Sequence, residues 1–256
     1  MLRPQIGLSF FLSFLAASAP RTQEKNIPGA KGPEPLVERK ASMQTTQPPT
    51  LTLRPATRTD IPALARLLVQ LYHAELPGTL RGPIEGQHAL LAYTLERGNG
   101  SLFRRYVAVN QHNTPVATAS LRLARDRVLS SVPPGTMRQA FHLLGAAHAL
   151  RLFALLLSSA LTPKITMPVD GAYLHSLVVD AEQRGRGVGA WLVGEIEQLA
   201  RADGARTLQL RVVVGNNSAR RLYERLGYRV GSRTPPLVAT IAVATDLMTR
   251  SIAPPA

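Results

Sequence analysis

Residues 181–191 read "AEQRGRGVGAW", and they place three glycines and two arginines directly before an apolar, helix-forming run. Glycine lets backbone N–H groups come close to a ligand, and the first turn of a helix presents N–H groups that lack a partner within the helix. Together they make a site for an anion, such as a phosphate group. Arg184 and Arg186 add positive charge, although either could also be a solvated loop arginine. This stretch therefore predicts a phosphate-binding loop at a helix start.

The flanking segments predict a strand before this loop and a strand and short helix after it. Residues 172–180, "AYLHSLVVD", have strand character, and a helix is expected from the loop to about Ala202, closed by Gly204. Residues 206–214, "RTLQLRVVV", form the next expected strand. The segment "NNSARRLYERLG" predicts a short capped helix that ends at Gly227.

Two motifs in these segments resemble those of the GNAT superfamily, the Gcn5-related N-acetyltransferases. The first is Arg184-Gly185-Arg186-Gly187-Val188-Gly189, which is similar to the family's acyl-CoA signature. The second is Asn216-x-x-Ala219-x-x-Leu222-Tyr223-Glu224-x-x-Gly227-Tyr228, which is similar to a second family motif at every key position. The resemblance implies an α+β GNAT fold, in which helices flank a central, mostly antiparallel, twisted sheet.

The domain is expected to cover residues 51–252. A strand and a helix open it, a second helical region covers 79–98, and a hairpin follows with strands near 104–110 and 115–125. Residues 126–171 are expected to be a helical insertion before the strand that precedes the loop. Within it, the helical region 136–161 is expected to border the acceptor site.

Residues 1–50 are expected to be an extension outside the domain. An early arginine, a short apolar run and small residues outline a signal peptide, but Pro20 suits cleavage badly. The polar segment 21–50 has the composition of a disordered chain. A start of translation at Met43 explains the same features, so both alternatives stay open.

Composition limits the classes of function. The chain has no cysteine, which excludes disulfides, thiol catalysis and thiolate metal sites, and no metal is expected. The formal net charge of +14 favours anionic partners. A nucleic-acid binder is the weaker alternative, because only 5% of the residues are aromatic and no binding motif is present. No membrane partner is expected, since the apolar runs are too short for a confident span.

The resemblance implies which residues bind acetyl-CoA. The pyrophosphate is expected on the backbone of the loop and helix start, and the pantetheine arm on the main chain of the preceding strand. Asn216 resembles a residue that contacts this arm, and it could equally be only a helix cap. The predicted cofactor-binding residues are Leu177, Val178, Val179, Arg184, Gly185, Arg186, Gly187, Val188, Gly189, Ala190, Asn216, Ala219 and Tyr223.

Tyr223 and His175 are the predicted catalytic residues. Tyr223 resembles the family's general acid, which would protonate the departing thiolate; the alternative is a packing role. Many relatives carry a glutamate on one of the two central strands, but here neither strand offers a carboxylate. His175 is therefore the expected base, with a plain core residue or ordered water as alternatives. Strict alternation places Tyr173, His175, Leu177 and Val179 on one face of the strand.

These features predict an N-acetyltransferase that moves an acetyl group from acetyl-CoA to a primary amine of a small molecule or protein by direct attack. The alternative is an acyl-CoA-binding regulatory module without turnover. A cytoplasmic location is expected, because acetyl-CoA is made and kept there. The acceptor amine is not specified by the sequence, and a homodimer stays open.

Overall fold

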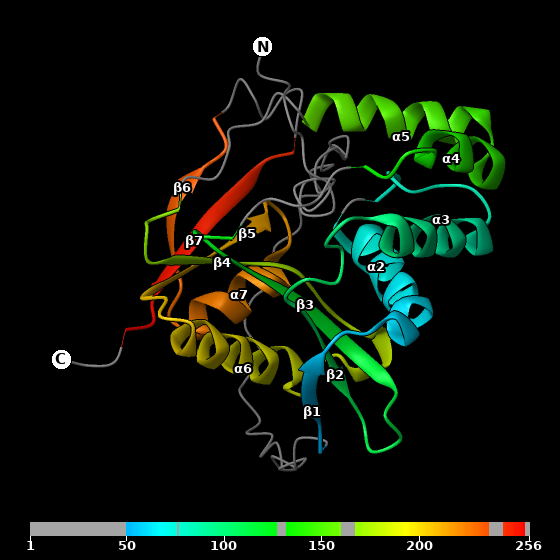
Figure 1. Cartoon of the computed structure of the whole chain (residues 1–256). Coiled ribbons are helices and arrows are strands. Elements are labelled where there is room, and N and C mark those ends of the chain that lie inside the picture. Colours follow the sequence, from blue (N-terminus) through cyan, green and yellow to red (C-terminus); the bar gives the residue numbers. More distant parts are fainter. Residues whose placement is uncertain (1–49, 76, 127–131, 160–166, 236–242, 254–256) are drawn as a thin grey trace, which may run out of the picture.

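The computed structural model describes residues 50–75, 77–126, 132–159, 167–235 and 243–253 (Figure 1). The expectations for the N-terminal extension, including Met43, concern residues outside this range.

Seven strands form one sheet in the order β1-β2-β3-β4-β5-β7-β6. Their bounds are β1 Thr52–Pro55, β2 Arg105–Val109, β3 Pro115–Leu123, β4 Gly171–Val179, β5 Thr207–Val213, β6 Arg229–Arg233 and β7 Thr245–Ser251. The β4–β5 pair is parallel and every other pair is antiparallel. The mostly antiparallel sheet confirms the predicted fold class.

Helices cover both faces of the sheet (Figure 1). The helices on one side are α2 Ile61–Glu75, α3 Ile84–Arg97, α4 Thr136–Leu144 and α5 Ala146–Ser159, and those on the other are α6 Val188–Ala202 and α7 Asn217–Arg225. Each side has its own apolar core: α2 and α3 pack with Val107, Val109 and Val178, while α6 packs with Ala172, Leu174 and Leu208. The sheet is thus the middle of three layers.

Helices α4 and α5 lie in the interval where the helical insertion was expected. Helix α4 packs on α3 and α5 packs on α4, and α4 comes close to α3 at Gly86, where an added Cβ would lie 2.2 Å from the carbonyl oxygen of Leu143. Because only a glycine fits at this crossing, the insertion is held firmly against the domain.

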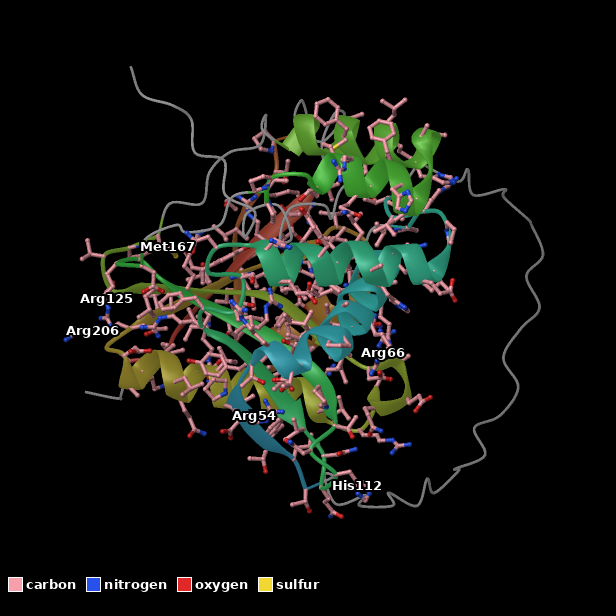
Figure 2. All side chains as sticks on the ribbon, turned by 45° about the vertical axis from the view of Figure 1, so that its right-hand side comes forward. Arg54, Arg66, His112, Arg125, Met167 and Arg206 are labelled. Carbon is pink, nitrogen blue, oxygen red and sulfur yellow. The ribbon has the colours of Figure 1, made fainter. Side chains whose placement is uncertain are left out.

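A bidentate ion pair fixes the junction between β1 and α2. Arg54, which is labelled in Figure 2, donates from its two terminal nitrogens to the two carboxylate oxygens of Asp60, at 2.7 and 2.8 Å. Asp60 also accepts from the backbone N–H and the hydroxyl of Thr57. These partners favour the charged carboxylate, chiefly through Arg54, and lower the pKa of Asp60 to about 2. The start of α2 is therefore locked to the sheet.

Strand β4 contains a bulge that breaks the alternation of its side chains. His175 pairs with Ser120 and Val178 with Thr118, so β4 has one more residue than β3 in this interval. Ser176 takes up the extra length with a φ of 52°. The prediction that Tyr173, His175, Leu177 and Val179 share a face is therefore wrong: Leu177 and Val179 pack on the α6 side, as Ala172 and Leu174 do. Tyr173 and His175, which alternate with those two, face the α2 side.

Candidate acetyl-CoA site

The two central strands separate at the bulge. The β4–β5 ladder runs from Gly171–Thr207 to Leu174–Leu210, whereas β5 continues to Val213 paired with β7 alone. Along the described chain, the second half of β4 therefore has a strand partner only on its β3 side. The resulting opening, which we call the β4–β5 split, lies at the carboxyl ends of two parallel strands, where open α/β sheets bind ligands.

The backbone of Val179 faces this split. The N–H of Asp180 donates to the carbonyl of Val116 in β3 at 2.8 Å, so Asp180 points its main chain toward β3. In a strand, the N–H and C=O groups of successive residues point to opposite neighbours. Those of Val179 therefore point away from β3, toward the side of β5. The carbonyl of Val179 accepts a 3.0 Å bond from Nε of Arg184. The Val179 N–H thus has no strand partner on this side among the described residues, and the contacts of Leu177, Val178 and Val179 with a pantetheine arm stay predictions.

The predicted phosphate loop lies directly beyond β4, between a short 3-10 turn at Ala181–Gln183 and α6. Gly185 and Gly187 have φ values of +77° and +79°, a left-handed conformation that side chains with a Cβ rarely adopt. Gly187 caps α6, and the helix's first backbone bond runs from Trp191 N–H to the Gly187 carbonyl. The N–H groups of the first turn, at Val188, Gly189 and Ala190, are left without acceptors inside the helix and can hold an anion.

Polar contacts tie the loop to α2. Gln70 accepts from the backbone N–H of Ala181 at 2.9 Å and from Arg184 at 3.4 Å. Arg184 thus hydrogen-bonds to both Gln70 and the carbonyl of Val179, which connects the loop to α2 and to the end of β4. Arg186 is exposed and contacts only Gln183 among the described residues, at 3.5 Å, which leaves its charge near the glycines.

Asn216 caps α7, the helix that begins beyond the end of β5. Its side-chain oxygen accepts from the backbone N–H of Ala219 at 3.1 Å. Its amide nitrogen donates to a carboxylate oxygen of Glu75 at 3.4 Å. The capping alternative is therefore present in the structure, and contacts of Asn216 or Ala219 with a ligand remain predictions.

Tyr223 lies on α7 with only 7% of its surface exposed, and its ring meets that of Tyr228 edge-on at 5.8 Å between centroids. Burial, followed by the negative charge of Glu75 and the nearby Tyr173, raises the pKa of Tyr223. The phenol is thus protonated at neutral pH, the state that a general acid needs.

His175 stands in a basic and enclosed environment. Its ring stacks on Tyr173 at 5.8 Å between centroids, and Nδ1 is 3.2 Å from the Ser176 hydroxyl. Burial, followed by the charges of Arg105 and Arg122, lowers the pKa of His175 to about 3. The imidazole is therefore neutral at physiological pH, and it is a weak acceptor for the proton of an ammonium group.

Glu75 is a residue of this site that the sequence did not reveal. It ends α2, and it reaches Asn216 across 141 positions of the chain. Burial raises the pKa of Glu75 to about 7, and the bond from Asn216 opposes this rise. Neither of the two motifs includes it, and its polar character at a helix end suggests only a solvated position. The cue in the sequence is weak: an acid directly before "LPG" at the end of an apolar helix.

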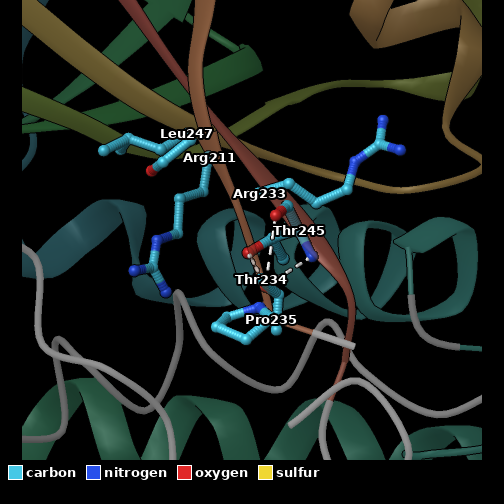
Figure 3. Close-up of a pocket in the computed structure, with 7 residues that line it drawn as sticks. Arg211, Arg233, Thr234, Pro235, Thr245 and Leu247 are labelled. Atoms are coloured by element: carbon cyan, nitrogen blue, oxygen red, sulfur yellow. Dashed lines mark hydrogen bonds between the residues drawn. The ribbon is translucent and has the colours of Figure 1, made fainter. Parts of the chain in front are cut away.

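A pocket of about 230 Å³ is lined by residues of β5, β6, β7 and the segment after β6 (Figure 3). Its lining residues are Arg211, Ser232, Arg233, Thr234, Pro235, Thr245 and Leu247. The Thr234 hydroxyl accepts from the backbone N–H of Thr245 at 2.9 Å, which joins two walls of the pocket. The charge of Arg211 also acts on Tyr173 of β4.

Within the described residues, no group of three or more His, Asp or Glu side chains could hold a metal ion. Nor does any helix in that part of the chain have the length and apolar character needed to cross a membrane.

Comparisons with known proteins agree with this geometry. Residues 68–228 match the model of the acetyltransferase (GNAT) family. An uncharacterised N-acetyltransferase of Methanocaldococcus jannaschii is 39% identical over 57 residues, which cover 22% of this chain and 25% of that protein, so the match spans about a quarter of this relative.

Solved structures are similar in fold. The crystal structure of an acetyltransferase has a TM-score of 0.53 and 24% identity, covering 79% of this chain and all of that one. A GCN5-related N-acetyltransferase of Kribbella flavida has a TM-score of 0.46 and 21% identity, over 78% of this chain and 97% of its own. Since the family model matches more than half of the sequence, the chain belongs to the GNAT family of acetyltransferases.

Proposed function

We propose that the protein transfers an acetyl group from acetyl-CoA to a primary amine of a small molecule or protein. The observation that carries this proposal is the β4–β5 split, with the glycine loop directly beyond β4 and α7, the helix that carries Tyr223, beyond the end of β5. Family membership and the match of N-acetyltransferase relatives support it. A cytoplasmic location goes with the proposal, because the acetyl donor is found there.

The residues present fit acetyl-CoA. Bound in the split, acetyl-CoA supplies the acetyl group as a thioester. The N–H groups from Gly187 to Ala190 would hold the pyrophosphate, with Arg186 adding charge. The N–H of Val179, which points away from β3, would donate a hydrogen bond to the pantetheine arm or to the thioester carbonyl, which it would polarise.

The buried phenol of Tyr223 would give its proton to the sulfur as the carbon–sulfur bond breaks. The raised pKa of Tyr223 keeps the proton on the phenol oxygen until negative charge develops on the sulfur beside it.

The acceptor amine would approach from the α2 side of the sheet. Tyr173 and His175 face this side, and Arg211, which lines the pocket, acts electrostatically on Tyr173. The charge of Arg211 favours an acceptor that carries negative charge near its amine. Arg233, which also lines the pocket, is paired with Asp246. His175 as the base remains the prediction of the sequence, but its lowered pKa makes it a weak acceptor of a proton.

A screen of amines with acetyl-CoA tests the proposal. Spermidine, free amino acids, an aminoglycoside and a peptide with a free N-terminus are incubated with the protein, and released CoA is measured. Turnover with an acceptor is expected. Binding of CoA without turnover of any of these amines would favour the alternative of a regulatory module.

Tyr223→Phe tests the acid. The substitution removes only the hydroxyl, so kcat should fall on the order of 10²-fold while the affinity for CoA barely changes. Steady-state kinetics and calorimetry with CoA measure the two effects. An unchanged kcat would reduce Tyr223 to a packing residue.

A further inference from the structure

Glu75 brings a carboxylate to the β4–β5 split from outside the sheet. It ends α2, which packs on β3 and β4, and it contacts Asn216 at the start of α7. Its negative charge acts on Tyr173 of β4 and on Tyr223 of α7, so it lies within electrostatic range of both side chains. The two central strands offer no carboxylate of their own in this region.

We propose that Glu75 is the general base of the reaction, accepting a proton from the ammonium form of the acceptor, and that Asn216 positions it. This inference rests on the proposed acetyl transfer and specifies which residue activates the amine.

The geometry of Asn216 explains how the carboxylate is held. Its side-chain oxygen is committed to the N–H of Ala219 at 3.1 Å, so its amide nitrogen has to face away from the helix. There it donates to Glu75 at 3.4 Å. One side chain thus caps α7 and orients the base, and the position of Glu75 is coupled to the helix that carries Tyr223.

The groups around Glu75 suit a base that works near neutral pH. Tyr72 from its own helix, Tyr173 from β4 and Tyr223 from α7 lie within electrostatic range of it, and all three have raised pKa values and stay uncharged. Partial burial disfavours the carboxylate and the Asn216 donor favours it, which leaves a pKa of about 7. A base with this pKa is substantially ionised at pH 7 and still holds a proton well, which is the best compromise for general base catalysis.

The proton balance closes with the residues present. The carboxylate of Glu75 takes one proton from the ammonium, and the freed nitrogen lone pair forms the bond to the acetyl carbon. The carbon–sulfur bond breaks, and its electron pair takes the proton of Tyr223. Tyr223 recovers a proton from the nitrogen that has just been acylated, and Glu75 releases its proton to solvent. One amide, one thiol and one proton result.

The test compares the pH dependence of kcat/KM for the unmodified protein and Glu75→Gln, with acetyl-CoA and an amine that the screen has shown to react. Gln keeps the size of the side chain and an oxygen that can accept from Asn216. For the unmodified protein, kcat/KM should rise about tenfold per pH unit below pH 7 and level off above it. In Glu75→Gln, kcat/KM at pH 7.5 should fall on the order of 10²-fold. The rise of kcat/KM up to pH 7, which we call the acidic limb, should be absent, and the affinity for CoA should be unchanged.

Two further variants serve as controls. Glu85→Gln makes the same change at an exposed position of α3 and should leave the profile unchanged. His175→Gln should retain the limb near pH 7, since His175 is already neutral there.

Asn216→Ser provides an independent test. Serine keeps a cap for α7 but removes the donor to Glu75, so the limb should move to higher pH. A limb that persists unchanged in Glu75→Gln and does not move in Asn216→Ser would overturn the role of Glu75 while leaving acetyl transfer intact. Absence of turnover by the unmodified protein would instead contradict the proposed function itself.

Discussion

At the scale of single residues, the glycines of the loop motif serve different physical purposes. Gly187 has a positive φ and open space around it, so its conformation excludes other residues. Gly189 has no positive φ, but an added Cβ would lie 3.3 Å from Leu222 and 3.8 Å from Val179. Gly187 therefore shapes the predicted phosphate site, whereas Gly189 lets α6 pack closely against α7 and β4.

Gly187→Glu should abolish binding of CoA. The new side chain would bring a bulky negative charge to the place predicted for the pyrophosphate, and calorimetry with CoA measures the loss. Gly194→Glu is a matched control, because it makes the same change two turns further along α6, where a Cβ meets no atom within 4 Å. If a folded Gly187→Glu variant bound CoA as tightly as the unmodified protein, the loop would not be part of the CoA site.

The residues that the sequence could predict are those whose role depends on near neighbours. The loop glycines, the Asn216 cap and the position of Tyr223 are all specified within a few positions of each motif. Glu75 could not be found in this way, because its contact with Asn216 spans 141 positions. Its raised pKa arises from burial, which only the folded chain creates.

At the scale of elements, hydrophobic periodicity predicted the helices and strands around the motifs well. The hairpin expected at 104–110 and 115–125 is β2 and β3, and the strand expected at 172–180 is β4. The bulge in β4 could not be predicted, because Ser176 is not a residue that marks a positive φ and the extra residue is visible only against β3. Because of this bulge, the side chains of Leu177 and Val179 lie on the α6 side of the sheet and not on the side of Tyr173 and His175.

Buried Glu197 joins three elements on the α6 side. It accepts from the Tyr228 hydroxyl at 2.9 Å and from Arg250 of β7 at 2.7 and 2.9 Å. Arg201, one turn further along α6, adds a bond at 3.1 Å. The carboxylate therefore connects α6 to β7 and to the segment that follows α7.

Glu197→Gln should lower the free energy of unfolding by about 1.5 kcal/mol, because it removes the charge of a buried carboxylate that hydrogen-bonds to the partly exposed Arg250 and Arg201. Urea unfolding followed by circular dichroism measures the change. Glu195→Gln, on the same helix but outside this network, should cost under 1 kcal/mol. Similar midpoints for the two variants would show that the network contributes little.

At the scale of the whole molecule, the sheet separates two apolar cores, and the β4–β5 split is where the two sides meet. Glu75 and Tyr173 belong to the α2 side, whereas Tyr223 and the glycine loop belong to the α6 side. The proposed reaction needs groups from both. The resemblance to a known family predicted this architecture, since local patterns alone do not specify strand order.

The split also has a consequence for amide hydrogen exchange. Along the second half of β4, neighbouring N–H groups face opposite sides: that of Asp180 is bonded to β3, and that of Val179 faces the split. Without ligand, exchange should be slow at Asp180 and fast at Val179. Saturating CoA should slow exchange at Val179 far more than at Asp180, because a bound pantetheine arm would take the place of a missing neighbouring strand. NMR of deuterium exchange measures both amides, and equal slowing at the two would indicate general tightening of the fold.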